Sequence, residues 1–355
     1  MHIKTLTLEN FRSYRKRSFE FDSKNNLIVG DNGVGKTNLL ESIYCLSTGK
    51  SFRSSGQSKL INWDSDYSII RATTSVKNEI NELEIQYTLS PEINSKITKR
   101  KFLINKVAKT RSAYLFSAIK SVVFHPEDIR LVAGSPSRRR DFIDDILSQI
   151  DWRYTQALSQ YNKALKHRNE LLDQIKAGIS QSTELFYWDK SIIKNSEIVY
   201  QFRLDFFKLV NDFFVKHPDS EIQKIFIKYY PSVITQNKLD SFYQKDLACG
   251  YTQIGPHRDD FSFNNHIFKS EDKNLAAWGS RGQQRLAVLG IRLAQINFID
   301  QKIKDKPILL LDDIFSELDA KHQQLVFNLC RDYQTFYTST EDNNLSTGKI
   351  NQVVI

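Results

Sequence analysis

Alternating hydrophobic and polar residues dominate the first third of the chain. The segments IKTLTL and RSFEF, and later SIIRATTSV, ELEIQYTL and KFLINKV, place apolar side chains at every second position. This period of two is typical of β-strands that bury one face. Clusters of Asn, Pro and Lys separate the later strands, so we expect residues 63–111 to form an antiparallel sheet rather than a strand–helix–strand crossover.

Two runs of apolar residues at alternating steps of three and four predict two long helices, separated by a turn at KAGISQST. Arg168 occupies one position of the first run, and Asn195 occupies one position of the second. Each run covers only about three or four heptads, which favours an ordinary antiparallel helical lobe over a true coiled coil. The runs are Tyr154, Leu158, Tyr161, Leu165, Leu172 and Ile175, then Leu185, Trp188, Ile192, Val199, Phe202, Phe206, Leu209 and Phe213.

Strand patterns return in the last third of the chain, first in KIFIKYY and DFSFNNHIF. A helix from about Gly282 to Ile299, a buried strand PILLLD, a helix from about Asp319 to Cys330 and the strands TFYTS and INQVVI follow. The helical block therefore interrupts an α/β domain built from both ends of the chain. We expect an N-terminal head part at 1–135, an inserted helical lobe at 136–220 and a C-terminal head part at 221–355.

The composition is that of a folded protein, with 40% hydrophobic and 26% charged residues in a chain of 355. No run of about 18 apolar residues occurs, and the charged start MHIKTLTLENF is no signal peptide, so no membrane span is expected. A net charge of +9 suits a polyanionic partner such as DNA, but a solvated basic surface explains it equally well. A reducing, cytoplasmic compartment is favoured because the cysteines show no metal or disulfide spacing: Cys45, Cys249 and Cys330.

The segment GDNGVGKT satisfies the spacing G-x-x-x-x-G-K-[ST] of a phosphate-binding loop. Its glycines let backbone N–H groups point into one concavity, Lys36 can reach the β- and γ-phosphates of ATP, and the Thr37 hydroxyl can bind Mg²⁺. A chance glycine turn is the alternative, but an apolar strand precedes the loop and a helix is predicted from Thr37 to Ser47. The expected nucleotide contacts are Gly30, Asp31, Asn32, Gly33, Val34, Gly35, Lys36, Thr37 and Asn38.

Two carboxylates follow the apolar strand of the segment PILLLDDIFSELD. A strand that ends at Asp312 places an oxygen ligand for Mg²⁺ near the phosphate loop, so Thr37 and Asp312 are the expected metal ligands. Asp313, one residue on, can orient or deprotonate the attacking water, and it is the expected catalytic residue together with Lys36. A solvated carboxylate at a strand end is the alternative for Asp313.

The chain resembles the ATP-binding cassette ATPases in the order of three motifs: the phosphate loop, the segment SRGQ, and the apolar strand with its acid pair. The resemblance implies an α/β head with a mixed sheet and an inserted helical lobe, and it implies two ATP molecules bound between two heads. Ser280, Gly282 and Gln283 would then contact the γ-phosphate that the other subunit holds. The segment SELD, ending at Asp319, would cross the dimer interface.

Four further segments narrow the resemblance to the RecF family. The opening LTLENFRSY is similar to that of SMC-like and RecF-like heads, which implies that Arg12 lies near the nucleotide. The resemblance implies a homodimer that forms on ATP, binds double-stranded or gap-junction DNA, and works with RecR and RecO to load RecA. Its ATP hydrolysis would be weak, DNA-stimulated and used as a switch. The segments are residues 122–144, 255–263, 282–285 and 309–319.

Some positions depart from the cassette pattern. Asp313 stands where cassette transporters usually carry Glu, and Thr338 is the best placement for their switch histidine. His125 lies where a nucleotide-sensing glutamine would be sought, and it receives no role. Asp is one methylene shorter than Glu, so the water would lie farther from its carboxylate, which favours slow hydrolysis.

Three other functions compete with an ATP-gated DNA-binding dimer. A transporter motor does not fit the basic helical lobe between Lys36 and Ser280, a chromosome organiser of the SMC type needs much longer helical arms, and a small-molecule kinase leaves SRGQ and SELD unexplained. No base-reading motif is visible, so phosphate contacts should dominate DNA binding. Solvated faces or buried ion pairs are the alternative for the candidate clusters Lys99, Arg100 and Lys101; Arg138, Arg139 and Arg140; and Lys163, Lys166 and Arg168.

Overall fold

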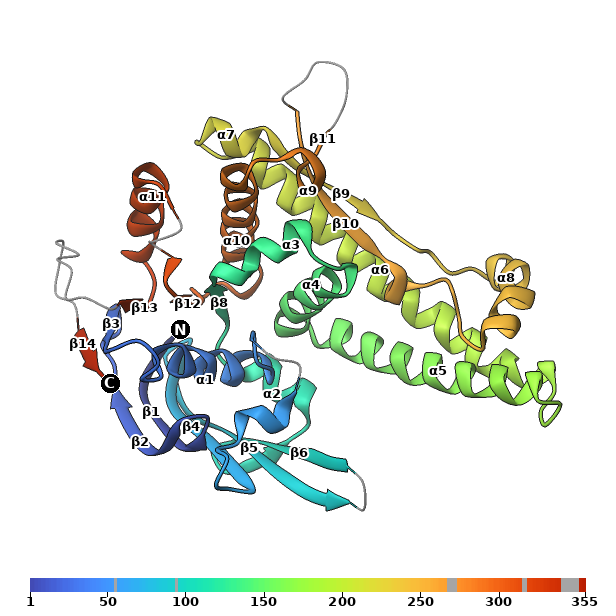
Figure 1. Cartoon of the computed structure of the whole chain (residues 1–355), viewed down its shortest axis with the longest axis horizontal. Helices are drawn as coiled ribbons and strands as arrows, with labels where there is room; N and C mark the ends of the chain where they lie inside the picture. The colour runs from blue at the N-terminus through green and yellow to red at the C-terminus, as the bar shows by residue number, and fades with distance from the viewer. Residues whose placement is uncertain (54–55, 93–94, 267–272, 315–317, 340–350) are drawn as a thin grey trace. The chain divides into compact units, whose positions relative to one another are not determined.

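The structure is a computed structural model, and it describes the chain except for residues 54–55, 93–94, 267–272, 315–317 and 340–350 (Figure 1). The chain divides into two compact units, one made of Met1–Asp128 with Gln295–Ile355, the other of Ile129–Ala294. This division differs from the boundaries expected at 135 and 220, because residues 221–294 fall within the second unit. None of the described helices is long and apolar enough to cross a membrane.

The first unit contains a six-stranded antiparallel sheet in the order β2-β1-β4-β5-β6-β7. This confirms the sheet predicted for residues 63–111. Positive φ angles at both residues of the turns 77–78 and 105–106 match tight two-residue hairpins, which twist in the same sense as the strands they join. The strands are β1 (His2–Phe11), β2 (Tyr14–Glu20), β4 (Tyr67–Val76), β5 (Glu79–Glu92), β6 (Ser95–Ile104) and β7 (Val107–Lys109).

A second sheet of the first unit is parallel and draws on both ends of the chain, in the order β14-β3-β13-β12-β8. Strands β8 and β12 are buried along their whole length, which explains their continuous apolar sequences. The predicted joining of the two chain ends in one domain is therefore confirmed. The strands are β3 (Asn25–Val29), β8 (Ser121–Phe124), β12 (Ile308–Leu311), β13 (Thr335–Ser339) and β14 (Asn351–Val354).

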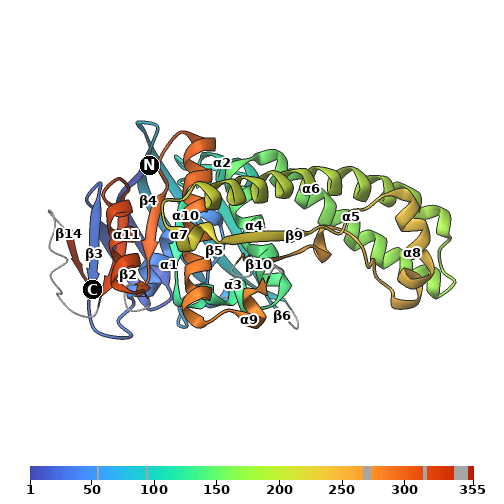
Figure 2. The same ribbon diagram turned by 90° about the horizontal axis from the view of Figure 1, so that it is seen from above.

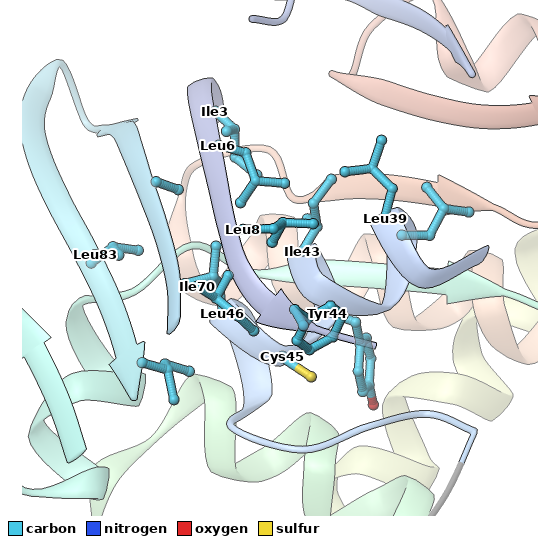
Figure 3. Packing of buried hydrophobic residues seen from close by; sticks show 14 of the residues in the cluster. Ile3, Leu6, Leu8, Leu39, Ile43, Tyr44, Cys45, Leu46, Ile70 and Leu83 are labelled. Atoms are coloured by element: carbon cyan, nitrogen blue, oxygen red, sulfur yellow. The ribbon is translucent and has the colours of Figure 1, made fainter. Parts of the chain in front are cut away.

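Helix α1 (Lys36–Thr48) carries the phosphate loop at its start and lies in the core of the first unit. Its apolar side chains pack against those of the antiparallel sheet (Figure 3). The same buried cluster includes Ile28, Leu310 and Phe336 of the parallel sheet, so both sheets contact the helix. This placement fixes the helix start, and hence the loop, relative to the strand ends. The unit also contains α2 (Arg111–Ser117) and α11 (Ala320–Cys330).

The second unit is built on α5 (Trp152–Lys176) and α6 (Leu185–Lys216), which pack side by side (Figures 1 and 2). This confirms the predicted helix pair. The unit also has a three-stranded sheet in the order β11-β10-β9. Its other elements are α3 (Arg130–Ala133), α4 (Pro136–Ile150), α7 (Ser220–Gln223), β9 (Ile225–Tyr230), α8 (Gln236–Cys249), β10 (Asp260–Asn265), β11 (Lys273–Asn274) and α9 (Leu275–Trp278). Helix α10 (Arg281–Ile303) begins in this unit.

The polar positions of the helix pair have specific partners. Arg168 is 1% exposed and donates to Asp189, Asp246 and Thr252 at 2.7–2.8 Å. A second buried arginine, Arg203, was not predicted to face the partner helix. The buried positions of α6 also follow alternating steps of four and three, but every second one lies one residue later than predicted. Asp189, Ser196, Arg203 and Val210 are buried where Trp188, Asn195, Phe202 and Leu209 were expected.

Candidate nucleotide-binding site

The phosphate loop (residues 30–37) joins β3 to α1 in the first unit. Gly33 and Gly35 have φ angles of +82° and +121°, a backbone conformation that glycine adopts at little cost. A Cβ at Gly35 would lie 3.1 Å from both the Ser13 Oγ and the Tyr14 Oη atoms. The Tyr14 hydroxyl, at the start of β2, also donates to the Gly35 carbonyl at 3.1 Å and so supports the loop.

Lys36 lies across the loop that precedes it. Its Nζ donates to the carbonyls of Gly30 at 2.5 Å and Asp31 at 3.0 Å, and the residue is only 7% exposed. These bonds use two of the three ammonium hydrogens and hold the charge within the curve of the loop. A glycine-rich loop followed by a lysine at the start of a helix is an arrangement that fits the phosphates of a nucleotide.

The predicted metal ligands lie together at the ends of β12 and the phosphate loop. The Thr37 hydroxyl donates to Asp312 Oδ1 at 3.0 Å. The Thr338 hydroxyl, at the end of β13, lies 3.2 Å from Asp312 Oδ1 and 3.2 Å from Asp313 Oδ1, and it accepts the Asp313 N–H at 3.0 Å. A hydroxyl and carboxylates are the oxygen ligands that Mg²⁺ prefers, so the donor set fits this ion.

The two acids have different environments. Asp312 is 3% exposed, and this burial raises the pKa of its carboxyl group, with a further increase from Asp313. His125, Thr37 and Thr338 oppose the increase by favouring the carboxylate form. Asp313 is exposed and has a φ of +49°, a conformation in which Asp is found more often than most residues. The buried Asp312 is therefore suited to binding an ion that stays in the site, and the exposed Asp313 is suited to contacting a ligand that enters from solvent.

His125 is a site residue to which the sequence assigned no role. It follows β8, whose neighbour in the sheet is β12, and its Nε2 lies 3.4 Å from Asp312 Oδ2. The carboxyl ends of parallel strands lie at one edge of a sheet, so adjacent ends bring together residues that are far apart in sequence. That rule could have paired His125 with Asp312 only if the strand order had been known.

Arg12 lies in the turn between β1 and β2, with a φ of +51°. Its guanidinium donates to both carboxylate oxygens of Glu41, Nε to Oε2 at 2.9 Å and Nη2 to Oε1 at 2.7 Å. Ser51 also donates to this fully buried carboxylate, and Arg53 lies 3.9 Å from it. Glu41 was not predicted as a site residue, although it lies one helical turn after Thr37. The nucleotide contact expected of Arg12 stays a prediction.

Asn38 is held by two neighbours on the outer side of the loop. Its amide donates to Ser13 Oγ at 2.9 Å, and its Oδ1 accepts from Arg53 Nη1 at 2.9 Å. The side chain therefore links the turn between β1 and β2 to the segment after α1. A nucleotide contact of Asn38 would come most directly from its backbone N–H, because both polar atoms of its side chain have protein partners.

The signature segment (residues 280–283) starts α10 in the second unit. Ser280 Oγ accepts the N–H of Gln283 at 3.3 Å, and Gln283 Oε1 accepts the N–H of Ser280 at 2.9 Å. This reciprocal pair is a capping box, which stabilises the helix start. Ser280 and Gly282 are exposed, and a Cβ at Gly282 would meet no atom closer than 4.0 Å. The exposed first turn leaves space for an incoming anion.

Of the segment SELD, residues 316 and 317 lie outside the described residues. Asp319 caps α11, since its Oδ1 accepts the N–H of His322 at 2.9 Å. This bond lowers the pKa of the exposed Asp319 carboxyl group. The interface role expected of Asp319 stays a prediction.

Several arginines proposed for DNA contact are held inside the second unit. Arg139 forms a two-bond pair with Asp260, at 2.6 and 2.9 Å, and is 9% exposed. Arg140 donates to the carbonyl of Asp259 at 3.0 Å, and Arg168 belongs to the buried network described above. In the first unit, Arg100 donates to the carbonyl of Gly49 at 2.9 Å. The exposed members of the candidate clusters are Lys99, Lys101, Lys163 and Lys166.

The segment GPHRDDFSF is mainly structural. A Cβ at Gly255 would collide with the Tyr161 hydroxyl, and that hydroxyl lies 2.6 Å from His257 Nδ1. Asp259 is 2% exposed and accepts from Arg203 at 2.7 Å and from the Ser232 N–H at 2.6 Å. The residues that support the family resemblance here are therefore those that hold the second unit together.

Comparison with known proteins adds independent support. A family model described as RecF/RecN/SMC N terminal domain matches residues 2–353. A protein named DNA replication and repair protein RecF, from Lachnoclostridium phytofermentans, is 36% identical over 365 residues, which cover 100% of this chain and 98% of the relative. A protein of the same name from Leptospira interrogans is 35% identical over 351 residues, with 96% and 92% coverage.

Solved structures agree with these matches. A structure described as the recombination mediator protein RecF–ATP in the RecFOR pathway has a TM-score of 0.85 and 30% identity, covering 97% of this chain and 93% of that one. An Smc head bound to the C-winged helix domain of ScpA has a TM-score of 0.50 and 18% identity, covering 96% and 90%. At that identity the second match shows the fold alone, which is that of an ABC-type ATPase head.

Proposed function

Because this chain belongs to the RecF family, within the RecF/RecN/SMC group of ATPases, we propose that it is an ATP-gated DNA-binding protein of replication and repair. The proposal depends most on one observation, the 3.0 Å bond between Thr37 of the phosphate loop and Asp312 at the end of β12. That bond joins the two predicted halves of the nucleotide site, which are separated by most of the sequence.

Each residue of the site has a distinct part in this proposal. Backbone N–H groups of the glycine loop and the ammonium of Lys36 bind the phosphates of ATP. Thr37 and Asp312 hold Mg²⁺, which neutralises phosphate charge when it is bound. Asp313 faces solvent and accepts a hydrogen bond from the attacking water, while Thr338 holds both acids in place.

The remaining steps extend to a second subunit and to partners. The exposed signature segment binds the γ-phosphate held by another copy of the chain, so ATP closes a homodimer and slow hydrolysis opens it. The closed dimer binds double-stranded or gap-junction DNA, and with RecR and RecO it promotes RecA loading at single-strand gaps. The same proposal includes a weak ATPase that DNA stimulates. It also includes a cytoplasmic location, because the DNA lies in the cytoplasm.

DNA affinity measured with and without nucleotide tests the proposal. Fluorescence anisotropy of a labelled gapped duplex should show tighter binding with Mg²⁺–ATP than with Mg²⁺ alone, and light scattering should show a dimer under the same conditions. Lys36→Ala should lose both effects, because loss of one charge-assisted contact lowers ATP affinity about 10- to 100-fold.

Two outcomes would contradict the proposal. DNA affinity that does not respond to ATP in a protein that binds ATP would remove the gating step. Unchanged ATP affinity in folded Lys36→Ala would remove the phosphate-loop assignment itself.

A further inference from the structure

The buried carboxylate of Asp312 is surrounded by groups from the start of α1, from β13 and from the turn after β8. Its Oδ1 accepts from Thr37 at 3.0 Å and from Thr338 at 3.2 Å. Its Oδ2 faces His125 Nε2 at 3.4 Å. The first two donors come from the phosphate loop and β13, and the histidine follows β8, the strand on the other side of β12.

The turn after β8 determines which nitrogen of His125 carries a hydrogen. The backbone N–H of Glu127 donates to Nδ1 at 3.1 Å, so Nδ1 must be an acceptor. In the neutral imidazole the hydrogen is then on Nε2, the atom that faces Asp312. Asp128 accepts the backbone N–H of His125 at 3.2 Å, which stabilises the turn, and the centre of the Phe52 ring lies 5.2 Å from that of the imidazole ring.

We propose that His125 is a positioning residue that directs Oδ2 of Asp312, and that it is not itself a metal ligand. The proposal rests on the nucleotide site proposed above and assigns a role to a residue outside its ligand set. A metal-binding imidazole needs a nitrogen with a free electron pair toward the metal, whereas here the turn uses the Nδ1 pair and Nε2 bears the hydrogen. A donor at this point instead limits rotation of the carboxylate, so that Asp312 presents the same oxygen to the ion each time.

Mg²⁺ dependence of ATP affinity tests this role separately from hydrolysis. Binding of a fluorescent ATP analogue is titrated at increasing Mg²⁺ for the parent, His125→Ala, His125→Gln and His125→Asn. Gln places its amide nitrogen near the position of Nε2, and Asn places it near that of Nδ1. Loss of an outer-shell partner commonly costs at least about 10-fold in metal affinity. We therefore expect His125→Ala and His125→Asn to need about 10-fold more Mg²⁺, His125→Gln to be close to the parent, and affinity in EDTA to be the same for all four.

A second experiment identifies the metal ligands. Mn²⁺ replaces Mg²⁺ in the ATP complex, and electron spin echo envelope modulation detects any nitrogen bound to the metal. A positioning role predicts no coupling to a directly bound imidazole nitrogen in the parent. Such a coupling, present in the parent and absent in His125→Ala, would overturn the proposal and make His125 a ligand. Identical Mg²⁺ dependence in the parent and His125→Ala would also overturn it. If the parent binds no Mg²⁺–ATP, the proposed function fails first, which is a distinct result.

Discussion

At the scale of single residues, the site depends on polar side chains placed where strands end. Thr338 illustrates this, because its one hydroxyl contacts Asp312 and Asp313 and accepts the Asp313 N–H. The sequence placed Thr338 at the switch position, and the structure shows its physical connection to both acids. Its part in hydrolysis stays a prediction.

Asp313→Asn tests the division of labour between the two acids. The amide keeps the size of the side chain but removes the negative charge that would orient or deprotonate water. General acid–base groups contribute about 10²- to 10⁴-fold to rates, so hydrolysis should fall by that order while ATP binding is kept. The ATP-bound dimer should then persist, as measured by light scattering over time. Hydrolysis at the parental rate would mean that Asp313 is not the water-orienting acid.

Site residues could be predicted from the sequence where they are contiguous and form a recognisable motif. Gly33, Gly35, Lys36 and Thr37 are contiguous, and their geometry follows from local backbone requirements. His125 and Glu41 could not be assigned in this way, because their partners Asp312 and Arg12 reach them only through strand order and helix packing. Long-range pairs of this kind need the fold before they can be read.

At the scale of elements, a helix or strand could be predicted where its apolar residues recur at a regular spacing. The antiparallel strands and the long helices were predicted because one face of each is buried, and β12 was predicted because its apolar run is continuous. Helix α8 was missed because only Leu239 and Asp246 are buried along it, so it has no apolar stripe. The helices α5 and α6 were predicted correctly, but every second position of the α6 run was placed one residue too early, so that Arg203 rather than Phe202 is buried.

Ser280→Arg tests whether the start of α10 acts on a second subunit. The cis phosphate loop is unchanged, so monomer ATP affinity should match that of the parent, whereas ATP-driven dimerisation should be lost because a bulky side chain fills the place of the γ-phosphate. Ser280→Thr is the matched control, since it keeps a hydroxyl that can cap the helix. Equilibrium nucleotide binding and light scattering measure the two effects.

The trans assignment of Ser280 would be wrong if folded Ser280→Arg lost ATP as completely as Lys36→Ala. Ser280→Ala separates capping from phosphate binding. It should cost only about 1 kcal/mol of stability through loss of the cap. A larger loss of dimerisation than of stability would indicate a direct contact.

The carboxyl end of α2 is held by a buried lysine with a pH-dependent effect. Lys120 is 1% exposed, its Nζ donates to the carbonyls of Leu115, Ala118 and Phe116 at 2.5–3.1 Å, and burial lowers its pKa to about 7. The unfolded chain keeps the proton up to its ordinary pKa of 10.5. At a pH between these two pKa values, Lys120 takes up a proton when the chain unfolds. Its contribution to stability should therefore rise as pH increases from 7 to 10.

Chemical denaturation of the parent and Lys120→Met across this pH range measures that contribution. The variant lacks the hydrogen bonds from Lys120 to the carbonyls at every pH, so only the pH dependence of the difference in unfolding free energy reports the titration. The difference in unfolding free energy should grow in favour of the parent. Parallel pH profiles would contradict the lowered pKa of Lys120.

At the scale of the whole molecule, the count of 50 lysines and arginines overstates the basic surface available to DNA. Arg139 and Arg168 are buried and paired with carboxylates, and neither adds to a surface field. Composition alone cannot separate such residues from exposed ones. The positive charge left for DNA is carried by exposed lysines and by arginines such as the half-buried Arg138.

A comparison of Arg139→Ala with Arg138→Ala tests this separation. Arg139→Ala removes the two hydrogen bonds to Asp260, whose side chain is 32% exposed, and should cost about 1–3 kcal/mol of stability, as loss of hydrogen bonds to a charged group does. Arg138→Ala should change stability by less than about 0.5 kcal/mol. If Arg138 contacts a phosphate, the slope of log affinity against log salt should fall by about 0.9. Denaturation and anisotropy measure these effects, and equal stability of the two variants would contradict the structural role of Arg139.

The position of β3 has a consequence for synthesis of the chain. Both of its neighbours in the parallel sheet, β13 and β14, are encoded near the other end of the sequence. At about 5–20 residues per second, a ribosome needs tens of seconds to make them after β3 has emerged. During that time the strand that leads into the phosphate loop has unpaired edges in this sheet. A nascent chain therefore cannot complete its nucleotide site, and chaperones that cover exposed strand edges should act on it before release.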